Sequence, residues 1–328
     1  MISRDITLRS IVESDVDAIL PLLRRDPASP LSAQDYQDKL ADRQYRFEWT
    51  WIAQDDATGE ILAVIVYWGG PNDADGSGPH SIDGILAAPS LGTGEERIAV
   101  VTSLLTAAHE HFKSVLHAEN VPDYHVFIPG DWRDQPDVVE ALEWRQEAVE
   151  RAGLTDLLER LRYRWTPEAG VPAGRGRLTF RPEGDDEVFV DLFTRVLEGS
   201  LDTSSTKEAA TMGAAAQARE DVEFYRDVML GERDWWRVAV NGDGEVVGFG
   251  FPSRNPNAAV VGYLGVLPEY RGHGHVDEIL AEITRQAAEE LGMTQLSADT
   301  DLVNQPMAAS FERAGYVNVA RRLVFSAS

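Results

Sequence analysis

The 328-residue chain contains no cysteine. A disulfide framework, a thiolate–zinc site and a cysteine nucleophile are therefore excluded. The first residues, MISRDITLRS, lack the basic segment and the following apolar segment of a secretory signal. No run approaches the roughly 18 consecutive apolar residues of a membrane span. These absences predict a cytoplasmic protein that has no part in the membrane.

Basic residues are also scarce, with 30 Lys and Arg against 55 Asp and Glu and a formal net charge of −25. Acidic residues outnumber basic ones in both halves of the chain. A field of this sign repels phosphate backbones and anionic lipids, so we expect neither nucleic acid nor a membrane surface as a partner. The charge suits a cationic small molecule, and a solvated acidic surface explains the same counts.

The remaining composition is that of a globular protein, with 43% hydrophobic and 26% charged residues. At roughly 150 residues per domain, the length predicts two domains, each large enough to bury its own core. The segment 166–176 is rich in Pro and Gly and has no hydrophobic periodicity, which is typical of a linker. We therefore expect one domain at 1–165 and a second at 177–328.

Four short patterns occur in the same order in both halves. Each half opens with a strand followed by a helix, and each then has a β-hairpin with an Asp/Gly turn, at 51–63 and 236–248. The stretch ILAAPSLGTG at 85–94 parallels LGVLPEYRGHG at 264–274, and ERAG occurs in both halves. Such self-similarity predicts a tandem α+β repeat.

The most informative segment lies at 260–291. Its apolar start predicts a buried strand that Pro268 ends, and a helix follows the loop at 271–276. Glycines at 272 and 274 let an anion approach the backbone, and amides at a helix start have no partner within the helix. The segment is neither a Walker A loop nor a dinucleotide fingerprint. It predicts an anion site, with an ordinary glycine turn before a helix as the alternative.

The loop and a second motif resemble a known family. The stretch VLPEYRGHGH at 266–275 resembles the acetyl-CoA loop of the GNAT superfamily of N-acetyltransferases, whose pattern is Arg/Gln-x-x-Gly-x-Gly/Ala after a strand that ends in V-x-P. Further along, NQPMAASFERAGY at 304–316 resembles that family's second motif. With the duplication, the whole chain resembles a tandem GNAT protein. The resemblance implies an α+β fold of two GNAT-like domains, each a mixed, mostly antiparallel sheet flanked by helices.

The same resemblance implies acetyl-CoA as the co-substrate, no metal, and direct attack of an amine on the thioester. The strand before the loop would pair with the pantetheine arm, and the N–H of Val266 would stabilise the oxyanion. The loop would hold the diphosphate, and Asn304 would touch the pantetheine or thioester end. The cofactor residues expected on this basis are Leu264, Gly265, Val266, Arg271, Gly272, His273, Gly274, His275, Val276 and Asn304.

Three positions depart from the family pattern. Val276 stands where Gly or Ala is usual, so its side chain crowds the diphosphate. Phe311 replaces a tyrosine that acts as general acid in many members, and its expected role is to pack in the core. The strand at 258–263 has no carboxylate to act as general base. Asp299 and Asp301 are the nearest carboxylates, and we consider them as catalytic candidates and, alternatively, as a solvated rim.

The N-terminal half departs further. Its loop at 89–97 lacks the arginine and has Glu95 and Glu96 where a diphosphate would lie. We therefore predict a degenerate copy that shapes or covers the acceptor site, with the acetyl-CoA site in the C-terminal half. The predicted acceptor is a small-molecule amine. Two alternatives stay open, namely an acetyltransferase like mycothiol synthase and a non-catalytic regulatory protein that binds acyl-CoA.

Overall fold

The computed structural model describes residues 4–115, 121–256 and 258–327. The chain divides into two compact units. Unit 1 comprises Met1–Glu159 and Arg321–Ser328, and unit 2 comprises Arg160–Ala320. The division falls within strand β6 (Asp156–Trp165), ahead of the segment 166–176, and again within the last strand, β12 (Val317–Ser326).

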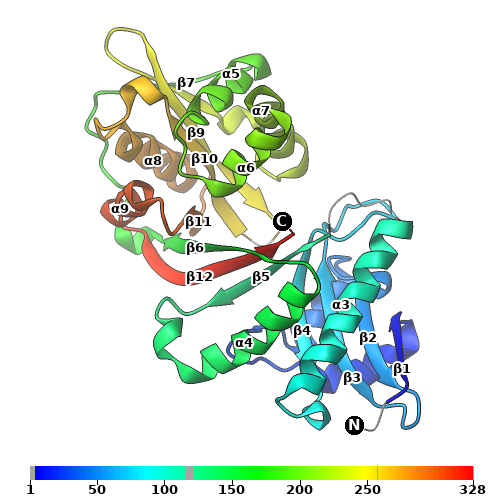
Figure 1. Ribbon diagram of the computed structural model, residues 1–328. Helices are drawn as coiled ribbons and strands as arrows, with labels where there is room; N and C mark the ends of the chain where they lie inside the picture. The colour runs from blue at the N-terminus through cyan, green and yellow to red at the C-terminus, as the bar shows by residue number, and fades with distance from the viewer. Residues whose placement is uncertain (1–3, 116–120, 257, 328) are drawn as a thin grey trace. The chain divides into compact units, whose positions relative to one another are not determined.

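Unit 1 is a mixed sheet with helices packed on it (Figure 1). Its strands pair in the order β1-β2-β3-β4-β5, and only the β4–β5 pair is parallel. The strands are β1 (Ile6–Ser10), β2 (Thr50–Asp55), β3 (Ile61–Trp68), β4 (Ser81–Ala87) and β5 (Asp123–Ile128), and the helices are α1 (Val16–Ile19), α2 (Ala33–Ala41), α3 (Glu95–Val115) and α4 (Pro136–Arg151).

Unit 2 repeats this plan, because its strands pair in the order β7-β8-β9-β10-β11 with only the β10–β11 pair parallel. The strands are β7 (Thr179–Pro182), β8 (Arg237–Val240), β9 (Val246–Asn255), β10 (Ala258–Val266) and β11 (Leu296–Asp301). The helices are α5 (Asp186–Val196), α6 (Thr203–Met212), α7 (Ala214–Glu223), α8 (His275–Arg285) and α9 (Gln305–Arg313). The expected hairpins and the tandem α+β fold are confirmed.

The sixth strand of each unit comes from the end of the other half of the sequence. The end of β12, Arg321 to Phe325, pairs antiparallel with β5 in unit 1. The end of β6, Arg160 to Trp165, pairs antiparallel with β11 in unit 2. The apolar side chains of each segment are buried in the unit that receives it, with Leu323 and Phe325 in one core and Trp165 in the other. The two halves have thus exchanged their last strands.

Helices cover the sheet of unit 2 on both faces (Figure 1). On one face, α5 and α7 pack against an aromatic layer that includes Phe193, Phe249 and Phe251. On the other face α8 lies close to β9, because Gly250 leaves room for it. A Cβ atom there would lie only 2.7 Å from Cδ1 of Ile283. This close packing holds α8 against β9.

Phe325 offers a test of the strand exchange. It is fully buried in unit 1, and its ring stacks on Tyr124 with centroids 5.9 Å apart. We expect Phe325→Ala to destabilise unit 1 by about 3–5 kcal/mol. Hydrogen exchange in the full chain would show the loss as faster exchange of the β5 amides. The control Val319→Ala, on the same strand and 40% exposed, is expected to change stability by less than about 0.5 kcal/mol. Equal effects of the two variants would contradict the exchange.

Candidate functional site

Strand β10 has an open edge towards β11. It pairs with β9 over most of its length, from Ala258 to Val266. With β11 its ladder consists, in the described residues, of the single pair Val260 and Ser297. Each of the nine residues of β10 is partly exposed, although the strand lies inside the sheet. The second half of β10 therefore has unpaired backbone next to space that no other strand fills.

The ladder alternation shows which backbone groups face this opening. The N–H of Leu267 donates to the carbonyl of Val247 at 2.9 Å, whereas Val266 lies opposite Gly248 and Leu264 opposite Gly250. Because hydrogen bonds to β9 alternate along an antiparallel pair, the backbone groups of Leu264 and Val266 point away from β9. Two of the three residues predicted to pair with pantetheine thus present their N–H groups to the open edge.

Gly265, the third predicted residue, has a different place. It alternates with Leu264 and Val266, so its backbone groups point towards β9. A Cβ atom on Gly265 would lie 2.8 Å from Cγ1 of Val196, at the end of α5. The glycine therefore lets α5 approach the strand, and we expect it to shape the opening by its small size.

A β-bulge at Gly262 bends β10 just before the opening. The register with β9 shifts between Val261 and Tyr263, and the hydroxyl of Tyr225 donates to the carbonyl of Gly262 at 2.8 Å. A Cβ atom on Gly262 would lie 2.8 Å from the ring of Phe251. The sequence analysis missed this bulge. Its signal was an isolated glycine within an apolar strand pattern.

The loop between β10 and α8 presents a row of free amides. Gly272 and Gly274 have φ values of +82° and +72°, which favour glycine, and Gly274 is the N-cap of α8. Within the described chain, the amides of residues 272–276 have no hydrogen-bond acceptor. Val276 is partly exposed in the first turn of the helix. The loop therefore has the unpaired N–H groups that an anion site requires.

Arg271 supports the loop from behind. Its guanidinium donates to three backbone carbonyls, those of Val266 at 3.0 Å, of Val196 at 2.8 Å and of Glu198. These bonds join the end of α5 to the end of β10. An arginine has five N–H donors, so two are left for another acceptor. The geometry makes Arg271 a structural tie, and its contact with a diphosphate stays a prediction.

Two further arginines lie at the loop, and the sequence analysis assigned them no role. Arg177 donates to the carbonyl of His273 at 2.9 Å and pairs with the buried carboxylate of Glu278 at 2.6 Å. A Cβ atom on Gly274 would lie 3.7 Å from Nη1 of Arg175. The available signal was the pair of arginines at 175 and 177, directly before a strand. Arg175 also pairs with Asp277 at 3.8 Å, so both arginines are tied to carboxylates in the first turn of α8.

The two loop histidines differ. His273 is exposed, whereas His275 has a buried Nδ1 atom without a partner in the described residues. Burial and the neighbouring Arg177 lower the pKa of His275 below its usual 6.5. Its ring is therefore neutral at pH 7, and His275 brings its amide rather than a charge to the loop.

Asn304 acts as the N-cap of α9, because its Oδ1 accepts from the N–H of Met307 at 3.3 Å. Phe311 is 2% exposed and stacks on Tyr163 with centroids 5.1 Å apart. The hydroxyl of Tyr316 is buried against Thr284 at 2.8 Å. The expected core packing of Phe311 is confirmed, and neither ring presents a proton donor to the open edge of β10.

The two carboxylates considered as catalytic candidates are both paired with arginines on the neighbouring strand. Asp299 binds Arg162 at 3.0 Å. Asp301 is 1% exposed, lies 3.0 Å from Arg160, and accepts from the N–H of Thr203 at 2.7 Å. Asp301 is thus not part of a solvated rim. It anchors the start of α6, and a catalytic role for either carboxylate stays a prediction.

Unit 1 has a different arrangement at the corresponding loop. Glu95 pairs with Arg151 and Glu96 with Arg4, so both acidic side chains have cationic partners. Near the end of β4 lies a cavity of about 570 Å³. Its lining includes Arg97, Trp144 and Arg145, with the two guanidinium groups 4.5 and 4.4 Å from the indole. The N-terminal copy therefore has a cavity near β4, while its loop has two glycines but lacks the arginine of unit 2.

Within the described residues there is no group of three or more His, Asp or Glu side chains that could hold a metal ion. None of the described helices is long and apolar enough to cross a membrane.

Residues 208–316 match the model of the acetyltransferase (GNAT) family. The match runs from α6 to the end of α9 and includes the open edge, the glycine loop and Asn304. No curated protein sequence matches the chain.

Solved structures show the same fold. A GCN5-related N-acetyltransferase from Sphaerobacter thermophilus is 16% identical, with a TM-score of 0.56 over 98% of this chain and 95% of that one. The glucosamine N-acetyltransferase region of a fungal multi-domain β-N-acetylglucosaminidase is 14% identical, with a TM-score of 0.53 over 99% of this chain and 38% of that one. A tandem GNAT protein from the clavulanic acid pathway is 16% identical, with a TM-score of 0.49 and 99% of both chains covered.

The matched segment and the fold agree with the geometry of unit 2. Residues 208–316 match the acetyltransferase (GNAT) family model, and the chain as a whole has a fold of two tandem GNAT-like domains.

Proposed function

We propose that unit 2 is an acetyl-CoA-dependent N-acetyltransferase whose acceptor is a small-molecule amine. The observation that carries the proposal is the open edge of β10 directly before a glycine loop with unpaired amides. An extended pantetheine arm would add to this edge as a strand does, and the loop would take the diphosphate. In unit 1, β4 likewise pairs with β5 only at Ser81 and Ile82, but most of its residues are buried, whereas every residue of β10 is partly exposed.

The backbone of β10 would also orient the reacting thioester. The N–H of Val266 points into the opening, so it would donate to the thioester carbonyl and to the oxyanion that forms on it. An amine nitrogen attacks the carbonyl carbon, the C–N bond forms, and the C–S bond breaks with its electron pair on sulfur. A single oxyanion donor of this kind typically lowers the activation barrier by about 2.7–4 kcal/mol.

The departing thiolate does not depend on a protein acid. Phe311 occupies the position of the usual tyrosine and is buried in the core. A thiol has a pKa of about 8.5, so the thiolate is a stable leaving group that takes its proton from water. The loss of a general acid, typically worth about 10²–10⁴ in rate, therefore leaves the reaction feasible.

A non-catalytic protein that binds acyl-CoA is the second candidate, and the arginine pairing of Asp299 and Asp301 favours it. Both candidates bind acetyl-CoA. Only the enzyme releases free CoA thiol when an amine is added, so thiol release across a panel of primary amines separates them.

The first test is the binding of acetyl-CoA to the full chain. We expect the melting temperature to rise with ligand concentration, since a ligand at 100 times its Kd stabilises by about 2.7 kcal/mol. Gly274→Glu adds a side chain and a negative charge at the diphosphate and should abolish this rise. The matched control is Gly94→Glu in the loop of unit 1, where a Cβ atom meets nothing within 4 Å, and it should keep the rise. A rise that survives Gly274→Glu would show that the loop is not the site.

A second test removes the proposed oxyanion donor. Val266→Pro deletes the N–H that faces the opening and breaks no hydrogen bond to β9, because Val266 and Gly248 are a non-bonded pair. We expect kcat for thiol release to fall by about 10²–10³, with the Kd of acetyl-CoA nearly unchanged. A melting curve recorded in parallel excludes unfolding. An unchanged kcat would mean that another group stabilises the oxyanion.

A further inference from the structure

Helix α7 carries two buried acceptor atoms that lack a donor. Gln217 and Asp221 lie one turn apart on the same face, and Nε2 of Gln217 donates to Oδ1 of Asp221 at 3.2 Å. Gln217 is 3% exposed. Its Oε1 atom and Oδ2 of Asp221 are both buried and have no hydrogen-bond partner in the described residues.

Two unpaired acceptors side by side are unusual in a folded protein. Leaving a buried polar atom without its hydrogen bond is costly, and for a carboxylate the cost is greater. Because both atoms accept and neither donates, they would be satisfied by a group that has several N–H donors and a positive charge. A primary ammonium group has three donors and one charge.

The pair lies on α7, which packs with α5 on one face of the sheet. Tyr225 follows α7 and binds the carbonyl of Gly262 at the bulge, and the ring of Tyr263 lies 6.2 Å from that of Tyr225. Burial raises the pKa of Tyr263, and the negative charges of Asp202 and Asp221 raise it further. Tyr263 precedes Val266 by three residues.

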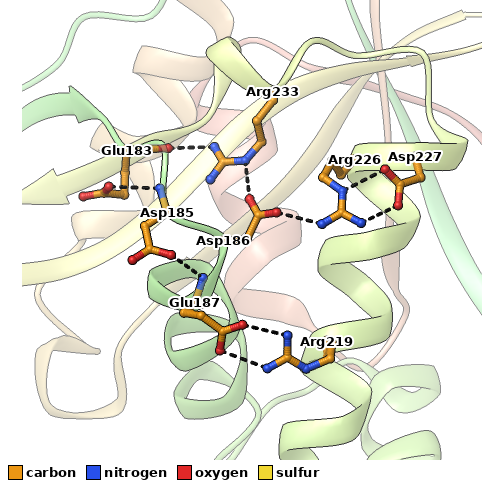
Figure 2. Close-up of polar contacts among 8 residues, drawn as sticks. All are labelled: Glu183, Asp185, Asp186, Glu187, Arg219, Arg226, Asp227 and Arg233. Atoms are coloured by element: carbon orange, nitrogen blue, oxygen red, sulfur yellow. Dashed lines mark hydrogen bonds and ion pairs between the residues drawn. The ribbon is translucent and has the colours of Figure 1, made fainter.

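Ion pairs hold α7 in this position, as Figure 2 shows. Glu187 at the start of α5 binds Arg219 of α7 through two hydrogen bonds of 2.8 and 2.9 Å. Asp186 bridges Arg226 at 2.7 Å and Arg233 at 2.8 Å. Arg226 lies in the turn that continues α7. None of these bonds uses Gln217 or Asp221, so the two acceptors are left out of the network that positions their helix.

We propose that Asp221 and Gln217 bind the primary ammonium group of the acceptor, and that Asp221 takes the proton that this group must lose before it attacks. The proposal rests on the acetyltransferase function proposed above and names the base for that reaction. The ammonium N–H groups would donate to Oδ2 of Asp221 and to Oε1 of Gln217. The nearby aromatic rings of Tyr225 and Tyr263 suit a bound cation.

The proton and electron balance of this step is complete. The ammonium R–NH₃⁺ gives one proton to the Asp221 carboxylate and becomes a neutral amine. Its lone pair forms the C–N bond with the thioester carbon, and the C–S bond breaks with its electrons on sulfur. The nitrogen then loses a second proton through water to the thiolate, and Asp221 returns its proton to solvent. The products are the acetamide, CoA thiol and one proton.

The charges around Asp221 suit a proton acceptor near neutral pH. Burial raises the pKa of Asp221 to about 7, and the carboxylates of Asp202, Glu208 and Glu220 act in the same direction, while the hydrogen bond from Gln217 opposes them. The positive charge of Arg160 lowers the pKa of the neighbouring Tyr225. Because the base must be ionised, kcat/KM for an amine should rise as the pH increases through about 7.

The test uses the full chain without acetyl-CoA and n-butylammonium as the probe. We expect a melting temperature that rises with probe concentration for the native protein, and Asp221→Asn should raise the Kd at least tenfold. The control Glu220→Gln removes the same charge from an exposed neighbour on the same helix and should leave the Kd within twofold. Tetramethylammonium, which has no N–H group, should bind at least tenfold more weakly than n-butylammonium. If Asp221→Asn and Glu220→Gln weakened n-butylammonium binding equally, the binding would reflect general charge attraction and the proposal would be overturned. Equal binding by the native protein and Asp221→Asn would also overturn it.

The pH dependence of stability separates a functional carboxylate from a structural one. A carboxylate whose pKa is higher in the folded than in the unfolded chain loses stability as the pH rises from its unfolded value near 3.8 towards about 7. Asp221→Asn removes this loss, so its melting temperature should exceed that of the native protein at pH 8. A lower melting temperature at pH 8 would mean that Asp221 serves packing, and the proposal would fail.

The two proposals fail separately. A rise in melting temperature with acetyl-CoA, together with amine binding that ignores Asp221, would leave the acetyltransferase in place and overturn only the ammonium site. Amine binding that depends on Asp221, without any response to acetyl-CoA, would overturn the proposed transferase and, with it, the role of Asp221 as its base.

Discussion

The site in unit 2 depends on backbone hydrogen bonds that β10 does not make. In the described residues the strand has no ladder partner on the side of β11 after Val260, and side chains satisfy only some of its backbone groups, such as the carbonyls of Gly262 and Val266. A sheet that closed over this edge would satisfy them and leave no place for a ligand. Three features shape this edge. A bulge at Gly262 bends the strand, the absence of a side chain at Gly265 lets α5 approach, and Arg271 bonds to the carbonyl of Val266.

Different groups lie at the two ends of the opening. At the start of α8 the free amides lie beside Arg175 and Arg177, whose charges are paired with Asp277 and Glu278. On the face covered by α7, Asp202 is paired with Arg160, and Asp221 has no ion-pair partner in the described residues. An anionic phosphate and a cationic amine would thus be drawn to opposite ends of one strand, with the reacting groups between them.

Much of this could be predicted from the sequence because it is local. The glycine loop, its helix, the hairpins and the burial of Phe311 follow from patterns within short windows. The partners of Arg271 and Asp301 could not be predicted, because each binds backbone groups roughly 75 to 100 residues away along the chain. The exchange of the last strands could not be predicted either, because the alternation of apolar and polar residues in Val317–Ser326 is the same whichever sheet the strand joins. Nothing in the sequence singled out Asp221, because the feature that marks it is the lack of a hydrogen-bond partner for Oδ2 in the described residues.

The exchanged strands also set the order in which the protein can be completed during synthesis. Unit 1 needs residues near Phe325 for its sixth strand, so the ribosome makes all of unit 2 before the first unit can close. Until then the edge of β5 has exposed N–H and carbonyl groups and an unfilled core position, which is the kind of surface that chaperones bind and that aggregates. The sixth strand of unit 2 is the end of β6, which is synthesised before the other strands of that unit. The half that was synthesised first is therefore the half that finishes folding last.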